Sequence, residues 1–159
     1  MSGEGRPEDT TVEANGLTIG IVAARWHGPI TDQLLARAVE AAKACGARPT
    51  AVRVAGALEL PVVAPQLART HHAVVALGCV VRGETAHFDY VCDSVTAGLT
   101  RIALDEATPV GNGVLTCENL AQAENRSGLP GSAEDKGWES VVAALDAALT
   151  LRELRRSEV

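Results

Sequence analysis

The sequence predicts an α/β fold, a doubly wound sandwich in which helices flank a four-stranded parallel sheet. Apolar residues make up 47% of the chain and aromatic residues only 3%, so the core must be built mainly from Val, Ala and Leu. Such a composition is typical of parallel strands that helices cover on both faces. Short apolar runs also alternate with longer amphipathic stretches, and 159 residues suit one domain that buries about 70% of its unfolded surface.

The first strand is expected at residues 17–24, an apolar run with few charges. A loop then leads into a helix expected over residues 30–45. Thr31 and Asp32 suit the first turn of that helix, and Gly46 is a typical stop signal.

The second and third strands follow the same pattern. Residues 50–55 predict a strand, and Pro61 opens a helix that continues to about residue 70. Residues 73–81 form an unbroken apolar run, typical of a strand buried on both faces. A small loop then precedes a helix expected over residues 88–105.

The fourth strand is expected at residues 109–116 and contains Gly111 and Gly113. Glycine inside a strand often marks the close approach of another group. A short helix is expected at residues 119–126, followed by a turn-rich break at 127–131.

The last helix is expected to open at Ser132, because Asp135 three residues later resembles a capping box, and to end near Arg155. The order β-α-β-α-β-α-β-α-α indicates a flavodoxin-like fold. Residues 1–14, which are polar, acidic and rich in glycine, are expected to form a mobile arm, and residues 15–159 a single α/β domain.

Charge and cysteine content restrict the function classes. The net charge of −6, without a basic block, argues against a nucleic-acid surface. No apolar run approaches the roughly 20 residues of a membrane span, and the first residues lack a signal-peptide pattern. The four cysteines are widely spaced without a CxxC pair, so we expect small buried side chains, no metal site and a cytoplasmic location. The adjacent His71 and His72 suit a solvated turn better than a metal pair.

Polar and aromatic residues gather where the predicted strands end. Trp26 follows the first strand, Glu59 the second and the segment 83–87 the third, while Asn112 lies within the fourth. Ligands of doubly wound folds bind outside the carboxyl ends of the strands. The small loop at Gly83 offers free backbone N–H groups to an anion, and His87 adds a proton carrier near neutral pH. The pattern predicts an enzyme site for a phosphorylated ligand.

These segments resemble the lumazine synthase family of riboflavin biosynthesis. The resemblance covers about residues 17–155 and is most specific in the segment from Ala76 to Val91. It is also carried by residues 56–61, 112–116, Arg126 and 134–137. It implies condensation of 5-amino-6-(D-ribitylamino)uracil with 3,4-dihydroxy-2-butanone 4-phosphate to 6,7-dimethyl-8-ribityllumazine, with loss of phosphate and water. It implies no metal or organic cofactor, and a route through a Schiff base, phosphate elimination and ring closure.

The resemblance also implies roles for the phosphate-side residues. His87 is the expected acid/base, although a helix-start histidine alone is more often a surface or capping residue. Gly83, Glu84 and Thr85 are expected to hold phosphate, Glu84 only through its backbone because its carboxylate repels an anion. Arg126 is the expected phosphate cation, whereas its position alone favours a partner for a helix C-terminus.

The remaining expected substrate-binding residues face the ring and the ribityl chain. Trp26 is expected to stack on the pyrimidine, with a core position as the alternative. Glu59 is expected to accept hydrogen bonds from ribityl hydroxyls, a role compatible with capping a helix N-terminus. Backbone groups are expected to read the polar edges, and Phe88 also belongs to the substrate-binding set. The residues that offer these backbone groups are Ala57, Leu58, Val80 and Val81.

Lys136 is expected near the pyrimidine or carbonyl groups, with a solvated helix lysine as the alternative. Asn112 stands where many relatives carry Phe, which weakens its assignment to the ring. The resemblance implies that Asn112, Arg126 and Lys136 come from a neighbouring subunit. It implies a homopentamer, which the long Pro130-containing link at residues 127–133 favours over a 60-subunit shell.

Two other functions remain open from the sequence. A non-catalytic flavin or lumazine carrier would keep the ring contacts and dispense with the phosphate groups, against which Thr85, His87 and Arg126 speak. An archaeal-type riboflavin synthase, which acts on two lumazines, would need no phosphate loop of this form. Competition by inorganic phosphate would discriminate between them.

Overall fold

The computed structural model describes residues 4–7 and 10–158 and has the expected order of elements. The strands are β1 (Thr18–Ala24), β2 (Arg48–Val54), β3 (Ala73–Val81) and β4 (Val110–Cys117). The helices are α1 (Gly28–Ala44), the 3-10 helix η1 (Ala57–Glu59), α2 (Leu60–Ala68), α3 (His87–Asp105), α4 (Leu120–Glu124) and α5 (Lys136–Ser157).

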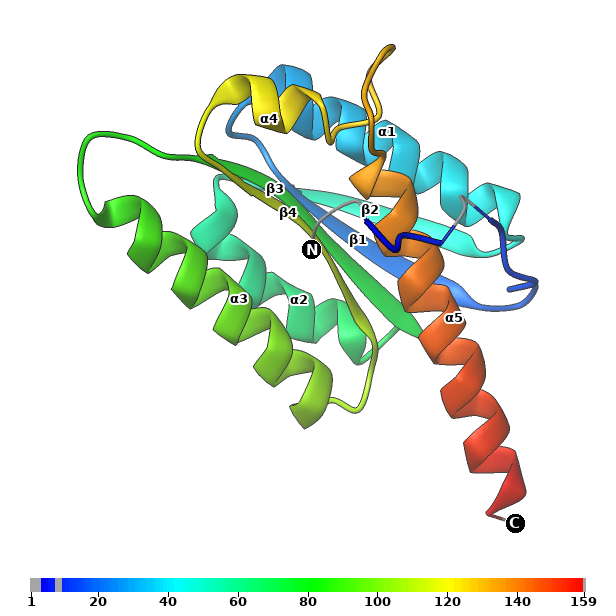
Figure 1. Cartoon of the computed structure of the whole chain (residues 1–159). Coiled ribbons are helices and arrows are strands. Elements are labelled where there is room, and N and C mark those ends of the chain that lie inside the picture. The colour runs from blue at the N-terminus through cyan, green and yellow to red at the C-terminus, as the bar shows by residue number, and fades with distance from the viewer. Residues whose placement is uncertain (1–3, 8–9, 159) are drawn as a thin grey trace.

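The four strands form one parallel sheet in the order β2-β1-β3-β4, which confirms the flavodoxin-like prediction (Figure 1). In register, Ile21 lies between Ala51 of β2 and Val75 of β3, and Val75 lies opposite Gly111 of β4. After β1 the chain adds β2 on one side of β1, and it then crosses back to add β3 on the other side of β1. Such a reversal of strand order opens a crevice at the carboxyl ends of β1 and β3.

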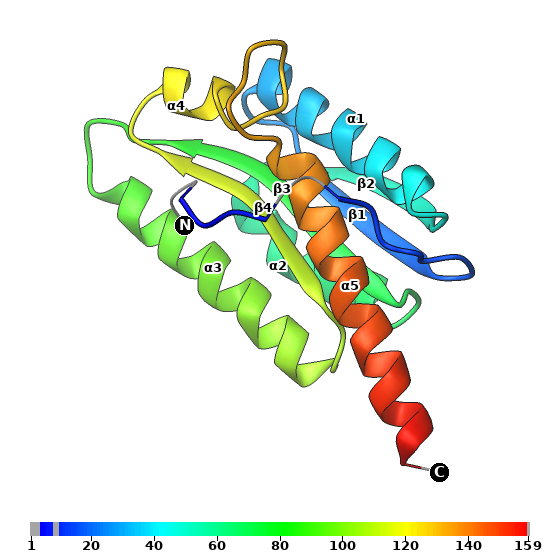
Figure 2. The same ribbon diagram turned by 45° about the vertical axis from the view of Figure 1, so that its right-hand side comes forward.

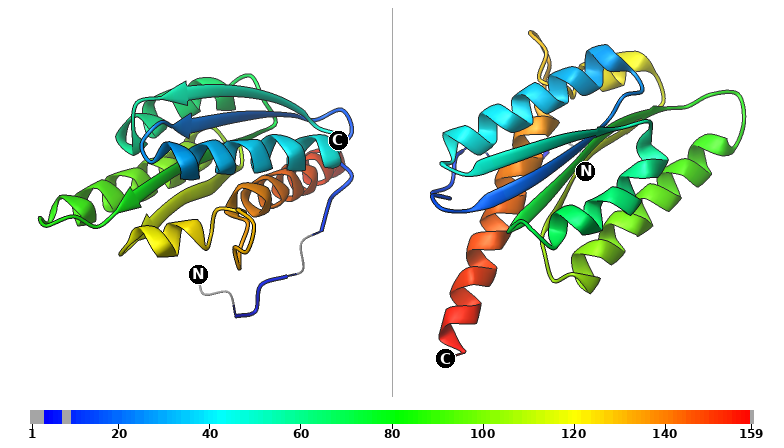
Figure 3. Two further views of the ribbon diagram at one scale, coloured as in Figure 1. Left: turned by 90° about the horizontal axis from the view of Figure 1, so that it is seen from above. Right: turned by 180° about the vertical axis from the view of Figure 1, so that it is seen from behind.

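Helices cover both faces of the sheet, with α1, α4 and α5 on one face and α2 and α3 on the other (Figures 1 and 3). Alternate strand residues serve the two layers: Ile21 and Ala23 belong to the cluster under α1 and α5, and Val22 to the cluster under α2 and α3. Helices therefore cover both faces of the central strand β3, whose residues 73–79 are all buried, and this explains its unbroken apolar run. The far end of α5 projects beyond the sheet (Figure 2).

The glycines of β4 mark the close approach of α5, as expected. A Cβ atom at Gly111 would lie 2.5 Å from the backbone oxygen of Ser140. One at Gly113 would lie 3.0 Å from the Ser140 hydroxyl oxygen. Only glycine lets this helix pack so closely on the strand.

Gly111→Ala is expected to destabilise the protein by about 1–3 kcal/mol, because the added methyl group meets backbone that cannot rotate away. Thermal unfolding at equal protein concentration measures the loss. Gly28→Ala is the matched control, since nothing lies within 4 Å of its Cβ position. Equal melting temperatures for the two variants would contradict this account of β4.

The predicted start of the last helix at Ser132 is wrong. Asp135 is the N-cap, and its carboxylate accepts the backbone N–H of Trp138 at 3.2 Å. The hydroxyl of Ser132 instead donates to the carbonyl oxygen of Glu124 at 2.5 Å. Ser132 thus fastens the link to the end of α4 rather than starting α5.

Parts of the N-terminal segment contact the domain. Ala14 is buried, and its N–H donates to the carbonyl oxygen of Cys45 at 2.8 Å. Arg6 pairs with Glu139 of α5 at 2.7 Å. The mobility expected for residues 1–14 stays a prediction, and residues 1–3 and 8–9 of that arm lie outside the described residues.

Candidate active site

A cavity of about 350 Å³ lies at the carboxyl ends of the first three strands. It brings together ten of the residues expected at the site. They are Trp26 after β1, Ala57, Leu58 and Glu59 after β2, Val80 and Val81 at the end of β3, and Gly83, Thr85, His87 and Phe88 beyond it.

The loop between β3 and α3 forms one wall of the cavity. Gly83, Thr85 and His87 are all exposed, and nothing lies within 4 Å of the Cβ position at Gly83, so an anion can reach the backbone. The N–H of His87 donates to the Thr85 hydroxyl oxygen at 3.3 Å, which leaves the O–H of Thr85 free to donate to a ligand. Glu84 is exposed and does not line the cavity. The loop thus provides N–H and O–H donors beside an imidazole.

Another part of the lining is aromatic. Trp26 is 69% exposed, so the core position considered from the sequence is excluded for this chain. Its ring lies 6.5 Å from that of His27, tilted by 55°. A Cβ atom at Gly56 would lie 3.1 Å from Cδ1 of Trp26 and 3.2 Å from Oε2 of Glu59. The glycine therefore allows the indole and the carboxylate to approach each other.

Glu59 caps the turn that it ends. Its Oε2 accepts the N–H of Gly56 at 2.9 Å, which fixes the carboxylate at the cavity wall. Across the described part of the chain, no hydrogen bond to Oε1 of Glu59 is present. Both interpretations made from the sequence are therefore compatible, because one oxygen caps the backbone and the other can accept from a ligand hydroxyl.

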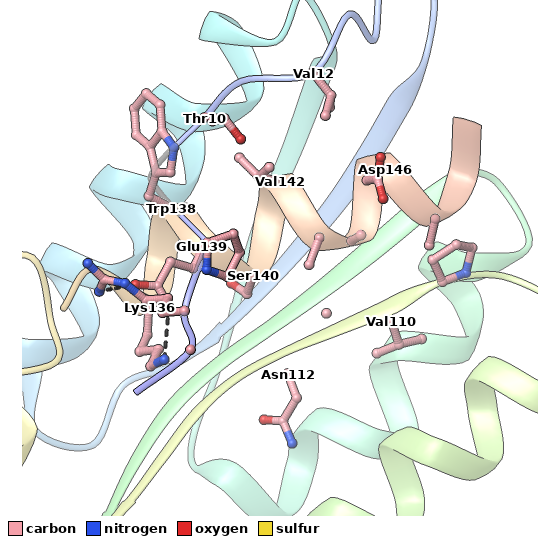
Figure 4. A pocket seen from close by; sticks show the side chains of 18 of the residues that line it. Thr10, Val12, Val110, Asn112, Lys136, Trp138, Glu139, Ser140, Val142 and Asp146 are labelled. Carbon is pink, nitrogen blue, oxygen red and sulfur yellow. Dashed lines mark hydrogen bonds and ion pairs between the residues drawn. The ribbon is translucent and has the colours of Figure 1, made fainter. Parts of the chain in front are cut away.

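Asn112 and Lys136 lie away from this cavity. They line a second one, of about 920 Å³, between β4, α5 and the N-terminal segment (Figure 4). Lys136 Nζ pairs with Glu139 Oε2 at 2.8 Å and Glu134 Oε2 at 3.0 Å. Burial opposes the charged form, but these two carboxylates outweigh it and raise the pKa of Lys136. Asn112 accepts the N–H of Val114 through Oδ1 at 3.0 Å.

Arg126 follows α4 and lines neither cavity. Its Nη1 donates to the carbonyl oxygen of Gln122 at 2.9 Å, which is the helix C-terminal contact that its position alone suggested. Within one chain, Arg126 therefore does not line the cavity beside the loop that it was expected to assist, and neither do Asn112 and Lys136.

Four lining residues were not expected from the sequence: His27, Gly56, Cys79 and Val91. His27 adopts a left-handed backbone, φ 54°, at the start of α1. His27 follows the expected residue Trp26 and Gly56 precedes the expected residue Ala57, so their positions in the sequence could have indicated them. Burial, with a smaller effect of nearby Cys117, raises the pKa of Cys79 to about 12. Its thiol is therefore neutral near pH 7 and is not a thiolate nucleophile.

No three His, Cys, Asp or Glu side chains within residues 4–7 and 10–158 are grouped to hold a metal ion. Nδ1 of His72 accepts the N–H of Thr18 at 3.0 Å, and all four cysteines are free. Across the same residues, no helix has the length and apolar character needed to cross a membrane.

The family model described as 6,7-dimethyl-8-ribityllumazine synthase matches residues 16–152. The chain belongs to this family. Proteins of that name are similar over nearly the whole length. The chain is 66% identical to the one from Salinispora arenicola (strain CNS-205), covering 99% of this chain and 95% of that protein.

Two further lumazine synthases support the same assignment. The protein from Thermobifida fusca (strain YX) is 64% identical over 98% of this chain and 91% of its own length. The one from Mycobacteroides abscessus is 59% identical, with 98% of each chain covered. The resemblance inferred from the residues around His87 is therefore confirmed, and the cavity at the strand ends lies inside the matched region.

Proposed function

We infer that the protein condenses 5-amino-6-(D-ribitylamino)uracil with 3,4-dihydroxy-2-butanone 4-phosphate to 6,7-dimethyl-8-ribityllumazine, in riboflavin biosynthesis. The observation that carries this inference is the first cavity, which is lined by the donors for an anion and His87 together with Trp26 and Glu59. The donors and His87 suit a phosphorylated four-carbon substrate, and Trp26 and Glu59 suit an aromatic ring that carries a polyol chain. Phosphate and water are the other products.

The residues of the cavity suit a reaction that is mostly proton transfer. The amine of the pyrimidine and the carbonyl of the butanone form an imine, phosphate leaves, and the ring closes. His87 takes and returns the protons at the reacting atoms. Trp26 holds the pyrimidine plane, and Glu59 orients the ribityl chain, so the two substrates meet in a fixed geometry. No protein nucleophile is required, which agrees with the neutral Cys79.

We propose that a second copy of the chain completes the site. Asn112, Arg126 and Lys136 lie off the His87 cavity of their own chain, so they act on the cavity of a neighbour. The surface around the cavity supports such a contact because Trp26 and Tyr90 are 69% and 73% exposed, more than large apolar side chains of a monomer usually are. A homopentamer is the assembly we favour, with a 60-subunit shell as the alternative.

The other parts of the proposal follow from charge and cysteine chemistry. The partners are small-molecule substrates and further copies of the chain. The net charge of −6 disfavours binding to nucleic acid. Free cysteines suit the cytoplasm, and no organic cofactor or metal takes part. A lumazine or flavin carrier is less well supported, since a carrier has no use for the donors at Thr85 or for a proton carrier.

The proposed function is tested by mixing the purified oligomer with both substrates and following lumazine absorbance and phosphate release together. Equal amounts of both products are expected. Ligand binding without phosphate release would overturn the synthase in favour of the carrier. Lumazine consumption with formation of riboflavin would instead indicate a riboflavin synthase.

A further inference from the structure

Arg82 joins three elements at the start of the phosphate-side loop. Its backbone N–H donates to the carbonyl oxygen of Cys117 at 2.9 Å, which ties the end of β3 to the end of β4. Its Nε donates to Glu118 Oε2 at 2.7 Å. Nη2 and Nη1 reach the two carboxylate oxygens of Asp89 at 3.2 and 3.4 Å. The guanidinium carbon lies 4.3 Å from the centroid of the Phe88 ring.

The loop that Arg82 encloses has little else to hold it. Residues 83–86 are exposed, and the loop projects beyond the sheet before α3 begins (Figure 1). The hydrogen bonds at its far end are local, from His87 N–H to the Thr85 hydroxyl oxygen and from Asp89 N–H to the carbonyl oxygen of Ala86. Arg82 precedes the loop, and Phe88 and Asp89 follow it. One side chain therefore fastens the two ends of the loop together.

We propose that Arg82 is a positioning residue, which holds the 83–86 loop and His87 in the conformation that binds the substrate phosphate. This inference rests on the proposed function and adds a residue to it. Without the clamp, a phosphate would have to order the loop on binding, at a cost in conformational entropy. Preorganised donors avoid that cost and hold the imidazole at a fixed place.

Arg82 does not serve as the phosphate cation itself. Glu118 accepts from its Nε, Asp89 accepts one bond from each terminal nitrogen, and Phe88 covers one face of its plane, so three of its five N–H donors are already used. An isolated exposed ion pair contributes little, but this guanidinium combines a forked contact, a second carboxylate and an aromatic stack. Lysine has neither the fork nor the plane, so the arrangement is specific for arginine.

Arg82→Ala is expected to raise the KM of the phosphorylated substrate about tenfold and to lower kcat severalfold, because donors and imidazole are no longer held. The KM of the pyrimidine substrate should change less than about twofold. Arg82→Lys should not restore the wild-type values. Arg101→Ala is the matched control. Arg101 also pairs with a carboxylate of α3, that of Asp105 at 3.1 Å, but it lies two turns or more along the helix from the residues that line the cavity. Equal effects at Arg82 and Arg101 would overturn the proposal.

Glu118→Ala separates positioning from direct binding, because the two roles predict opposite signs. Removing a negative charge strengthens anion binding if Arg82 is a phosphate cation that Glu118 neutralises. If Arg82 is a clamp, the same change loosens the loop and weakens inhibition by inorganic phosphate. In the Arg82→Ala background, Glu118→Ala should then add almost nothing. Tighter phosphate inhibition in Glu118→Ala would contradict the clamp.

Hydrogen exchange gives a readout that is independent of catalysis. The amides in the first turn of α3, at His87 and Asp89, should exchange faster in Arg82→Ala than in wild type, whereas Arg101→Ala should leave them unchanged. Unchanged exchange in Arg82→Ala would overturn the clamp even in an active enzyme. Absence of synthase activity in the wild-type protein would overturn the proposed function, while the exchange result would still decide whether Arg82 holds the loop.

Discussion

His87→Ala is expected to lower kcat by about 10²- to 10⁴-fold, the usual contribution of a positioned general acid/base. The KM values of both substrates should stay within about twofold, because the imidazole acts on transferred protons rather than on binding. Steady-state rates with each substrate varied in turn measure both quantities. The effect is large because His87 lines the cavity directly after the 83–86 loop, so its imidazole is placed to move protons beside the bound phosphate.

His72→Asn is the control for this prediction. His72 lies at the opposite, amino end of β3, where Nδ1 accepts the N–H of Thr18, and asparagine can offer an oxygen in its place. Full activity is expected from this variant. If His87→Ala instead raises KM with kcat unchanged, His87 binds substrate and the proton-transfer role is refuted.

Arg126→Ala is expected to raise the KM of the phosphorylated substrate about 10- to 100-fold, corresponding to a lost charge-assisted hydrogen bond of about 1.5–3 kcal/mol. The KM of the pyrimidine substrate should change little. The reason is the proposed reach of Arg126 into the cavity of a neighbouring chain, since within residues 4–7 and 10–158 its guanidinium donates one bond, to Gln122. Initial rates over a matrix of the two substrate concentrations measure the difference.

Thermal unfolding of the same Arg126→Ala oligomer is the control, because loss of the bond to Gln122 could weaken α4. A lower melting temperature with both KM values unchanged would show that Arg126 only ends its helix. Arg126→Lys should recover part of the phosphate affinity, since lysine keeps the charge without the fork.

Most of the fold could be predicted because parallel strands buried on both faces appear in the sequence as unbroken apolar runs. The apolar run at residues 73–81 marks β3 residue for residue, and Gly111 correctly indicated the close approach of another group, which the structure identifies as α5. The cap of α5 could not be predicted. Ser132 and Asp135 both suit an N-cap, and the choice depends on a tertiary contact, the bond from Ser132 to Glu124.

The cavity at the strand ends was also predictable, because residues after parallel strands meet at one edge of the sheet. Trp26, Glu59 and the loop from Gly83 therefore converge. Asn112 lies on the edge strand β4, Arg126 follows α4 and Lys136 begins α5, and none of the three lines the cavity that holds His87. The sequence motifs of one chain do not predict where a second chain would bind.

The central claim, that each site uses His87 from one chain and Arg126 from the next, is tested most directly by subunit complementation. His87→Ala and Arg126→Ala subunits would be co-refolded in equal amounts and assayed at low concentration of the phosphorylated substrate. Random mixing in a ring pairs an intact His87 with an intact neighbouring Arg126 at about one quarter of the interfaces, so about a quarter of wild-type activity is expected. Parents refolded apart and then combined should stay nearly inactive. A mixed oligomer of the correct size with no more activity than its parents would contradict a shared site.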